Sequence, residues 1–361
     1  MRIAVIGTGL VGGSIGLALS ALGHEVVGFD RDPDRLTRAR DIGAIGKAAP
    51  DAASAASGAD IAFVAVPVGA IVAAVQESLD AGAALVTDVG SVKGPVVAEV
   101  ARLCPEHAAR FIGGHPMAGS EQEGIDGARP DLFVGAAWVV TPTADTPEDA
   151  YTSLAGVLRD LQAEVVAVTP EEHDVLVAFV SHVPQLAAST LMDVATTHEA
   201  QHRALLRLAA GGFRDMTRIA ASQPSIWIDI LTSNRDAVLG ALDAYLVRLQ
   251  HARDIVAAGD RDAIEALLAR ARSSRRNLPV GISLSTKLVE LHVVVPDKPG
   301  ALADVTTLGS RLGVNIADLE IAHSKEGGGG VLVLIVSAAD ADAFVEGLRE
   351  RGYRVNRSEI E

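Results

Sequence analysis

The sequence is poor in cysteine, in aromatic residues and in positive charge. Cys104 is the one cysteine among 361 residues, so no disulfide can form within the chain, and a cytoplasmic location is expected. Aromatic residues make up only 3%, which leaves few rings for stacking on nucleic-acid bases. The chain carries 31 Lys and Arg against 46 Asp and Glu, and the resulting charge of −15 disfavours nucleic acids and membrane surfaces as partners. The length predicts two or three domains.

Charged side chains are also absent from residues 3–23, a stretch long enough for a membrane-spanning helix or a signal peptide. Six glycines interrupt this stretch, and each glycine weakens a helix by ~1 kcal/mol. The apolar run at 3–6 is also too short for the hydrophobic part of a signal peptide. We therefore expect no targeting segment here.

A glycine-rich turn follows this first apolar run. Residues 3–6 are expected to form a buried strand, 7–12 (GTGLVG) a tight turn, and 15–22 a helix. In this dinucleotide-binding pattern, glycines permit the turn and the close approach of a pyrophosphate, which the helix N-terminus faces. The residues expected to contact the dinucleotide are Gly7, Gly9, Leu10, Val11, Gly12, Asp30 and Arg31.

An acidic residue after the second expected strand, 26–29, indicates which dinucleotide binds. Asp30 lies 18 residues after Gly12. A carboxylate at this position accepts hydrogen bonds from the ribose hydroxyls of NAD and repels the 2′-phosphate of NADP. Asp30 therefore favours NAD. Arg31 could bind the 2′-phosphate, so NADP stays open as the alternative.

Strands and helices continue to alternate as far as residue 169. This alternation predicts a mostly parallel, doubly wound α/β sheet of Rossmann type over residues 1–169. The further expected strands are 61–66, 83–88, 111–114, 136–141 and 164–168, with crossover helices at 95–103 and 147–161.

Two polar loops, 88–94 and 114–121, follow ends of expected strands. Because ligands bind past the carboxyl ends of parallel strands, both loops are expected on the ligand side of the sheet. His115, which follows two glycines and precedes Pro116, is a candidate proton acceptor near neutral pH. The alternative is that each loop only connects two elements.

Helical periodicity replaces the strand pattern between 170 and about 280, with expected helices at 175–194, 204–208, 226–258 and 263–272. Ser181, His182 and Gln185 are polar residues in an apolar helix and share one face, because they lie three and four positions apart. Pro184 is expected to kink this helix and to open a site there.

A second polar segment of the helical region, 211–218, carries Arg214 and Arg218 one helical turn apart. A guanidinium group suits a carboxylate because it donates two parallel hydrogen bonds. The alternative is a surface ion pair of Arg218 with Asp215 or Asp229.

A polar linker at 281–287 is expected to lead into a third domain, 288–361. Strands are expected at 288–295, 318–324, 331–337 and 353–356, and helices at 302–312 and 340–351. The order β-α-β-β-α-β is typical of a ferredoxin-like α+β fold.

Five motifs, GTGLVGGS, TDVGSVKG, GGHPMAGSE, FVSHVPQ and GGFRDMTRIA, occur in an order that resembles the prephenate/arogenate dehydrogenase family of tyrosine biosynthesis. The resemblance covers residues 1 to about 280. It implies a Rossmann domain, an all-helical domain that forms a homodimer, and an active site between them. The implied reaction is the NAD-dependent oxidative decarboxylation of prephenate to 4-hydroxyphenylpyruvate, for which no metal is expected.

The resemblance also implies roles for single residues. His115 would be the catalytic base on the C4 hydroxyl, Ser91 its orienting partner, and Arg218 the partner of a substrate carboxylate. Ser181, His182 and Glu121 match pocket residues. The sequence departs from the family at Gln185, where many members carry histidine. An amide can donate to the keto oxygen of prephenate or accept from the ammonium of arogenate, so both substrates stay open.

The DKPGAL turn and the GVNI step of the third domain resemble the ACT domain, which binds amino acids. This resemblance implies an effector site for tyrosine around Pro299, Gly300 and Asn315, and the alternative is a structural or dimerising module.

Two other functions fit parts of the sequence. A β-hydroxyacid dehydrogenase has the same domain layout but depends on a lysine in its helical domain, and lysine is absent between Pro170 and Asn277. A non-catalytic sensor of NAD and amino acids would bind the cofactor without turnover, but it leaves Ser91, His115 and Arg218 without a role.

Overall fold

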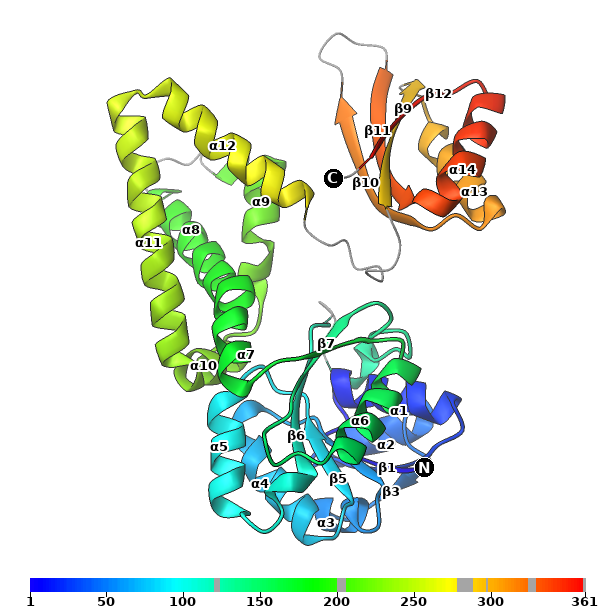
Figure 1. Ribbon diagram of the computed structural model, residues 1–361, viewed down its shortest axis with the longest axis vertical. Coiled ribbons are helices and arrows are strands. Elements are labelled where there is room, and N and C mark those ends of the chain that lie inside the picture. The colour runs from blue at the N-terminus through cyan, green and yellow to red at the C-terminus, as the bar shows by residue number, and fades with distance from the viewer. Residues whose placement is uncertain (120–123, 200–205, 278–287, 297, 324–328, 360–361) are drawn as a thin grey trace. The chain divides into compact units, whose positions relative to one another are not determined.

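The computed structural model describes residues 1–119, 124–199, 206–277, 288–296, 298–323 and 329–359 (Figure 1). The chain divides into two compact units, Met1–Gln250 and His251–Glu361. The first unit contains the expected Rossmann-type sheet and most of the helical region, and the second contains the ferredoxin-like sheet.

An eight-stranded sheet forms the centre of the first unit, in the order β3-β2-β1-β4-β5-β6-β7-β8. All neighbours are parallel except β6 and β7. The chain therefore winds outward from β1 in both directions, which confirms the doubly wound prediction. The strands are β1 Arg2–Ile6, β2 Glu25–Phe29, β3 Lys47–Ala48, β4 Ile61–Val64, β5 Leu85–Asp88, β6 Phe111–Pro116, β7 Ala137–Thr141 and β8 Glu164–Ala167.

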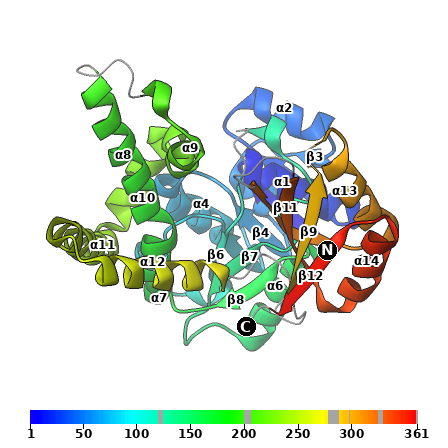
Figure 2. The same ribbon diagram turned by 90° about the horizontal axis from the view of Figure 1, so that it is seen from above.

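Helices cover both faces of this sheet (Figures 1 and 2). Alternate residues of a strand point to opposite faces. Ile3 and Val5 of β1 therefore pack with α1, α2 and α6, while Ala4 and Ile6 pack with α3, α4 and α5. The helices are α1 Leu10–Ala21, α2 Pro33–Asp41, α3 Ala52–Ala56, α4 Val68–Asp80, α5 Gly94–Leu103 and α6 Glu148–Asp160.

The helical region begins with one long helical stretch that changes its winding in the middle. α7 (Pro170–Val177) continues as a π-helical turn, η3 (Ala178–His182), and then as α8 (Val183–Glu199). Pro184 has no backbone N–H to donate to an α-helical acceptor in the preceding turn, which explains the altered winding. The structure thus has a change of winding just before Pro184, where a kink that opens a site was expected, and the opening of a site stays a prediction.

One expected helix, 226–258, is wrong because the chain breaks at Asn234, which ends α10 and is held by buried side-chain hydrogen bonds. Residues 204 and 205 of the expected 204–208 helix lie outside the described residues, and 206–208 form a 3-10 turn. The remaining elements are η4 Leu206–Leu208, α9 Gly211–Thr217, η5 Arg218–Ala221, α10 Pro224–Ser233, α11 Arg235–Ala258 and α12 Arg261–Arg276.

By length and apolar composition, the helical stretch Pro170–Thr197 is long enough to cross a membrane. It nevertheless buries His173, Asp174 and His182, and the first two bond to groups at the edge of the Rossmann-type sheet. We therefore interpret the stretch as part of a folded domain.

The second unit contains a four-stranded antiparallel sheet in the order β10-β11-β9-β12. Two helices, α13 and α14, pack on one face of this sheet around Leu291, Val305 and Phe344 (Figure 2). The element order confirms the ferredoxin-like prediction, while the expected linker 281–287 lies outside the described residues. The elements are β9 Leu288–Pro296, α13 Ala301–Leu312, β10 Ile316–His323, β11 Gly329–Ser337, α14 Ala338–Glu350 and β12 Arg354–Glu359.

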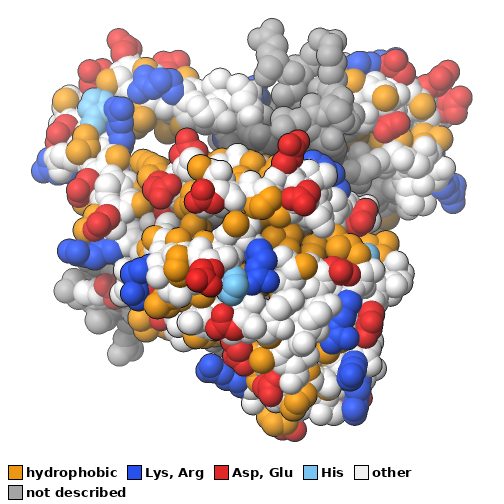
Figure 3. Space-filling view, turned by 60° about the horizontal axis from the view of Figure 1, so that its bottom comes forward, with side chains coloured by type: hydrophobic (Ala, Val, Ile, Leu, Met, Phe, Trp, Pro, Cys, Tyr) orange, Lys and Arg blue, Asp and Glu red, His pale blue; other side chains and the backbone are white. Residues whose placement is uncertain are grey.

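Acidic and basic side chains alternate over the surface shown in Figure 3, where neither sign gathers into a continuous patch among the described side chains. The chain as a whole has a charge of −15, so affinity for an anionic ligand has to come from local groups.

Two glycines of the first turn are fixed by packing. Gly7 has a φ of 93°, which favours glycine, and a Cβ there would lie 2.3 Å from the carbonyl oxygen of Ala65. A Cβ on Gly12 would lie 1.9 Å from the carbonyl oxygen of Gly7. The helix can therefore approach β1 only if residue 12 has no side chain.

Replacing Gly12 by alanine is expected to lower the free energy of unfolding by about 1–3 kcal/mol or more, because the new methyl group overlaps a backbone atom. Gly156→Ala is the matched control, since α6 leaves 4 Å of open space around that position, and it is expected to stabilise by roughly 0.5–1 kcal/mol. Denaturant unfolding of both variants measures these changes, and equal stability of the two would contradict this account.

Candidate functional site

The turn between β1 and α1 is open where a phosphate group would approach. A Cβ on Gly9 would meet no atom within 4 Å, in contrast to Gly7 and Gly12. Gly9 is the N-cap of α1 and supplies no side chain to the first backbone N–H groups of the helix. This end of α1 therefore presents N–H donors and the positive end of the helix dipole, as a dinucleotide pyrophosphate requires. Leu10 and Val11, which form this first turn, are half-buried.

Asp30 stands at the end of β2 and is tied to the same turn. Its Oδ2 accepts hydrogen bonds from the backbone N–H of Thr8 at 2.7 Å and from the Thr8 hydroxyl at 3.1 Å. Its Oδ1 accepts from the backbone N–H of Asp32 and lies 3.5 Å from Arg35. Arg31 is exposed beside it. A buried carboxylate held next to the glycine turn suits the ribose hydroxyls of NAD.

A buried ion pair links the ends of β5 and β6. The ammonium group of Lys93, which is 0% exposed, contacts Asp88 and donates a 2.9 Å hydrogen bond to the carbonyl oxygen of Gly114. Asp88 also accepts from the backbone N–H of Gly90 and of Gly114. Burial lowers the pKa of Lys93, and the Asp88 carboxylate opposes that shift. The pair fixes the backbone on which the next residue, His115, stands.

His115 lies within β6 rather than in a loop after it. The antiparallel partner β7 extends the strand, pairing His115 with Val139 and Pro116 with Trp138, so the expected end at residue 114 is wrong. The strand places the imidazole at the carboxyl end of the sheet. β6 is parallel to β5, so this is the edge at which the turn after β1 also lies.

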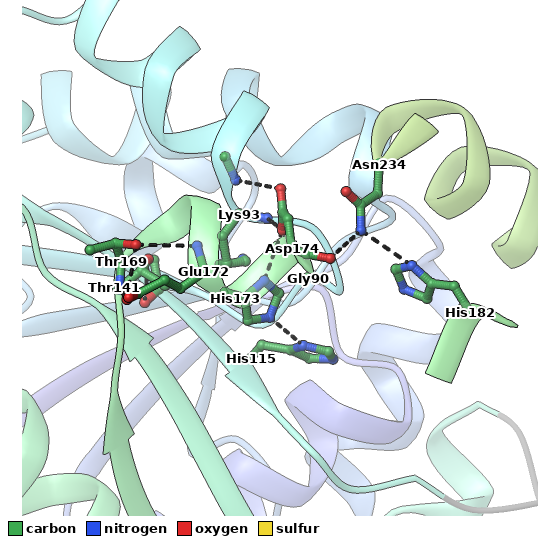
Figure 4. A network of polar contacts seen from close by, with 12 residues as sticks. Gly90, Lys93, His115, Thr141, Thr169, Glu172, His173, Asp174, His182 and Asn234 are labelled. Atoms are coloured by element: carbon green, nitrogen blue, oxygen red, sulfur yellow. Dashed lines mark hydrogen bonds and ion pairs between the residues drawn. The ribbon is translucent and has the colours of Figure 1, made fainter. Parts of the chain in front are cut away.

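Two further residues bind His115 in a chain of hydrogen bonds (Figure 4). The Nδ1 atom of His115 lies 2.9 Å from Nε2 of His173, and Nδ1 of His173 lies 2.8 Å from Oδ1 of Asp174. Asp174 in turn accepts from the backbone N–H groups of Lys93 and Gly94 at the start of α5. The predicted orienting partner, Ser91, is half-buried and forms no hydrogen bond with His115 in this part of the structure. His173 occupies the Nδ1 side of the ring instead.

Burial lowers the pKa of His115 well below its usual value. The neighbouring His173, Lys93 and His182 lower it further, because each opposes a second positive charge. The imidazole is therefore neutral near pH 7, as a proton acceptor has to be.

His182 ends the π-helical turn and points into the same polar cluster. The side-chain N–H₂ of Asn234 donates to the carbonyl oxygen of Asp174 at 2.8 Å and lies 3.3 Å from Nδ1 of His182. The Nε2 atom of His182 is buried and has no hydrogen-bond partner among the described residues. The imidazole ring of His182 lies edge to face with the Trp227 ring, with 6.1 Å between the ring centroids. Because Asn234 donates to Nδ1, the proton of His182 is assigned to Nε2, which makes that atom an unused donor.

Gln185 lies one turn further along α8 and is also buried. Its side-chain nitrogen lies 3.4 Å from the Ser189 hydroxyl, whereas its Oε1 is buried without a partner in the described part of the chain. Ser181 is half-buried at the end of the π turn. The predicted cluster at 181–185 thus presents an unused donor, on His182, and an unused acceptor, on Gln185.

Arg218 begins η5, which packs against α8 and α9, and its side chain is exposed, as is that of Arg214. Glu121 lies outside the described residues. In the second unit, Pro299, Gly300 and Asn315 are exposed, and Gly300, with a φ of 90°, precedes α13.

Sequence reasoning missed Lys93, His173, Asp174 and Asn234. Lys93 lies inside the TDVGSVKG motif, and the pair His173-Asp174 is an ionisable dipeptide at the start of an apolar helix, which is the signal that could have found them.

Three family models match the chain. The prephenate dehydrogenase nucleotide-binding domain matches residues 15–167, the prephenate dehydrogenase dimerization domain matches 169–270, and an ACT domain like that of the AHAS small subunit matches 291–350.

Whole proteins and solved structures match in the same way. Prephenate dehydrogenase of Bacillus subtilis is 32% identical over 94% of this chain and 92% of its own. The Aquifex aeolicus prephenate dehydrogenase in complex with hydroxyphenyl propionate and NAD⁺ is 28% identical with a TM-score of 0.72, covering 77% of this chain and 99% of that one. Synechocystis arogenate dehydrogenase is 30% identical with a TM-score of 0.68, covering 76% and 99%.

The burial of His182 predicts loss of stability in acid. Burial lowers its pKa to about 4, against about 6.5 in the unfolded chain, so the unfolded state binds the extra proton between these values. Stability is expected to fall as the pH falls from 6.5 to 4. His182→Gln should reduce the slope near pH 5 by close to one proton, about 1.4 kcal/mol per pH unit.

Denaturant unfolding at several pH values between 4 and 7.5 measures this slope. His251→Gln, at an exposed position of α11, is the control and is expected to keep the slope of the parent protein. Identical slopes in the parent and His182→Gln would show that His182 is not held neutral by burial.

Proposed function

Because the chain belongs to the prephenate dehydrogenase family, we propose that it oxidises and decarboxylates prephenate to 4-hydroxyphenylpyruvate with NAD⁺. The observation that carries this proposal is the neutral, hydrogen-bonded imidazole of His115, which stands at the same edge of the sheet as the glycine turn.

The residues present fit a dinucleotide. Gly9 leaves open space at the uncapped N-terminus of α1, and Asp30 is buried at the end of β2. We place the pyrophosphate against Gly9, Leu10 and Val11, and the ribose hydroxyls at Asp30. NAD⁺ supplies the hydride acceptor when bound. NADP remains an alternative through the exposed Arg31.

The side chains of the protein accept the proton and bind the substrate. His115 accepts the proton of the C4 hydroxyl through its Nε2 atom while the ring loses hydride and CO₂ and becomes aromatic, and it then returns the proton to the phenolate oxygen to give the 4-hydroxyl group. Arg218, on η5 beside α8, binds a carboxylate of the substrate, and the Nε2–H of His182 offers a neutral donor. Ser91 and Ser181, both half-buried, are the further polar groups that we assign to this site. The protein needs only to orient the substrate and to accept its proton, because formation of the aromatic ring drives the reaction.

A second substrate, L-arogenate, is favoured by one observation. The Oε1 atom of Gln185 is buried without a partner among the described residues, and its side-chain nitrogen faces Ser189. An unused carbonyl oxygen suits the ammonium group of arogenate better than the keto oxygen of prephenate, because an amide carbonyl oxygen and a keto oxygen are both acceptors only. Activity on both substrates is consistent with this site.

Formation of reduced cofactor from NAD⁺ with each substrate tests the proposal. His115→Asn is expected to lower kcat by ~10²–10⁴, because the proton acceptor is lost, and to leave the Kd of NAD⁺ nearly unchanged. If the parent protein binds NAD⁺ but turns over neither substrate, it is a sensor rather than this enzyme.

Exchanging the amide tests substrate choice. Gln185→His is expected to raise the ratio of kcat/KM for prephenate to that for arogenate by about tenfold, since an imidazole N–H can donate to the keto oxygen. Gln185→Asn, which keeps the amide, is the control. An unchanged ratio in Gln185→His would place the substrate side chain elsewhere.

We also propose that the enzyme is a cytoplasmic homodimer regulated by tyrosine. The helical region exposes many apolar side chains, as a subunit interface requires, and it matches a dimerization domain. The ACT-like domain suits an amino-acid effector near Pro299, Gly300 and Asn315. Cys104 is a free, buried thiol, which suits a reducing compartment. The exposed apolar residues of the helical region include Val175, Leu176, Phe179, Val180, Met216, Ile226, Ile228, Leu239, Leu246 and Val247.

Light scattering is expected to give twice the chain mass of 37.3 kDa, and added tyrosine is expected to inhibit turnover. A monomer at assay concentration would contradict the dimer, and turnover insensitive to millimolar tyrosine would contradict the effector.

A further inference from the structure

We infer that His173 and Asp174 are positioning residues that hold His115 in the tautomer with its proton on Nδ1 and its lone pair on Nε2. This inference rests on the proposed function, in which Nε2 of His115 takes the substrate's proton. The tautomer itself is a property of the protein and can be measured without substrate.

The first step concerns Asp174. Its two carboxylate oxygens accept hydrogen bonds from the backbone N–H of Lys93 at 2.7 Å and of Gly94 at 2.8 Å. A backbone N–H can only donate, so these bonds fix both oxygens as acceptors, and the start of α5 favours the negative charge. Oδ1 also faces Nδ1 of His173 at 2.8 Å. The proton in that contact therefore belongs to His173 Nδ1.

The second step follows from the chemistry of a neutral imidazole, which has one N–H donor and one lone pair. With its proton on Nδ1, His173 presents a lone pair at Nε2. This atom lies 2.9 Å from Nδ1 of His115, which must then donate. His115 is left with its lone pair on Nε2, and no described residue forms a hydrogen bond with that atom. The lone pair is available to a substrate hydroxyl.

A doubly protonated His173 would reverse this chain, because its Nε2–H would donate to His115. His115 would then accept at Nδ1 and carry its own proton on Nε2, a pattern that the measurement below distinguishes from the one inferred here.

The arrangement gives the two active-site histidines opposite tasks. Asn234 donates to Nδ1 of His182 and leaves that ring with an Nε2–H donor, whereas His173 accepts from Nδ1 of His115 and leaves an Nε2 acceptor. Each tautomer is set by the hydrogen bond at the other ring nitrogen. Neutral histidine thus serves as acceptor at one position and as donor at the other, without a change of charge.

Nitrogen NMR of the full-length protein labelled with ¹⁵N-histidine tests this directly. The chain has 10 histidines, and the His115 signals are those lost in His115→Asn. We expect a protonated, pyrrole-type Nδ1 and a pyridine-type Nε2 for His115 at pH 7. The reverse pattern in the parent protein would overturn the inference, whatever the enzyme turns over.

Two substitutions of His173 give a kinetic test. His173→Leu removes the acceptor and is expected to lower kcat by about 10²-fold, with the KM of the substrate and the Kd of NAD⁺ changed much less. His173→Gln keeps an acceptor oxygen near the Nε2 position and is expected to recover most of that loss. Glu171→Gln, exposed on the same helix, is the control and should keep kcat.

The outcomes are distinguishable. If His173→Gln and His173→Leu lose activity equally while the NMR pattern of His115 stays that of the parent, His173 is only a packing residue and the inference is wrong. If His173→Leu does not fold, the NMR spectrum of the parent protein still decides the tautomer. If neither prephenate nor arogenate is turned over by the parent, the proposed function fails while the tautomer can still be confirmed.

Discussion

The carboxylate of Asp174 is the interaction on which the candidate site depends. It joins the first turn of the helical region to the start of α5 through two backbone hydrogen bonds, and it holds His173 against His115. A buried carboxylate is tolerated only where several donors surround it, because its loss of hydration is costly. The N–H groups at the start of α5 meet that need. His115 is therefore oriented by the junction of sheet and helices rather than by its own strand.

Local positive charge compensates for an acidic chain. The substrates and the cofactor of the family are anionic, while this chain has a charge of −15. The N-terminus of α1 has no side-chain cap and carries the positive end of the helix dipole, and Arg218 is an exposed cation of the helical region. The buried Lys93 is engaged by Asp88, so it lowers the pKa of His115 and is not itself a ligand group. The exposed positive groups and the buried ammonium of Lys93 thus have different roles.

Much of this fold follows from local pattern. Apolar runs at 3–6 and 61–64 with glycines between them are sufficient to predict the sheet, and the glycine turn predicts the dinucleotide site. His115 was found because a polar residue followed a strand. The contacts of His173, Asp174 and Asn234 were not predictable, because they join residues 58, 81 and 60 positions apart. Periodicity describes one element at a time and does not indicate which elements meet.

The π-helical turn at Ala178–His182 has a geometric consequence for His173, which precedes it, and for His182, which ends it. An α-helix rotates by about 100° per residue, so residues nine positions apart, such as His173 and His182, point to nearly opposite sides of a regular helix. A wider turn rotates less per residue and brings the two rings toward one side. A regular α-helix wound from the same residues would turn His182 away from Asn234. The π-helical turn therefore sets the direction in which His182 points relative to His173.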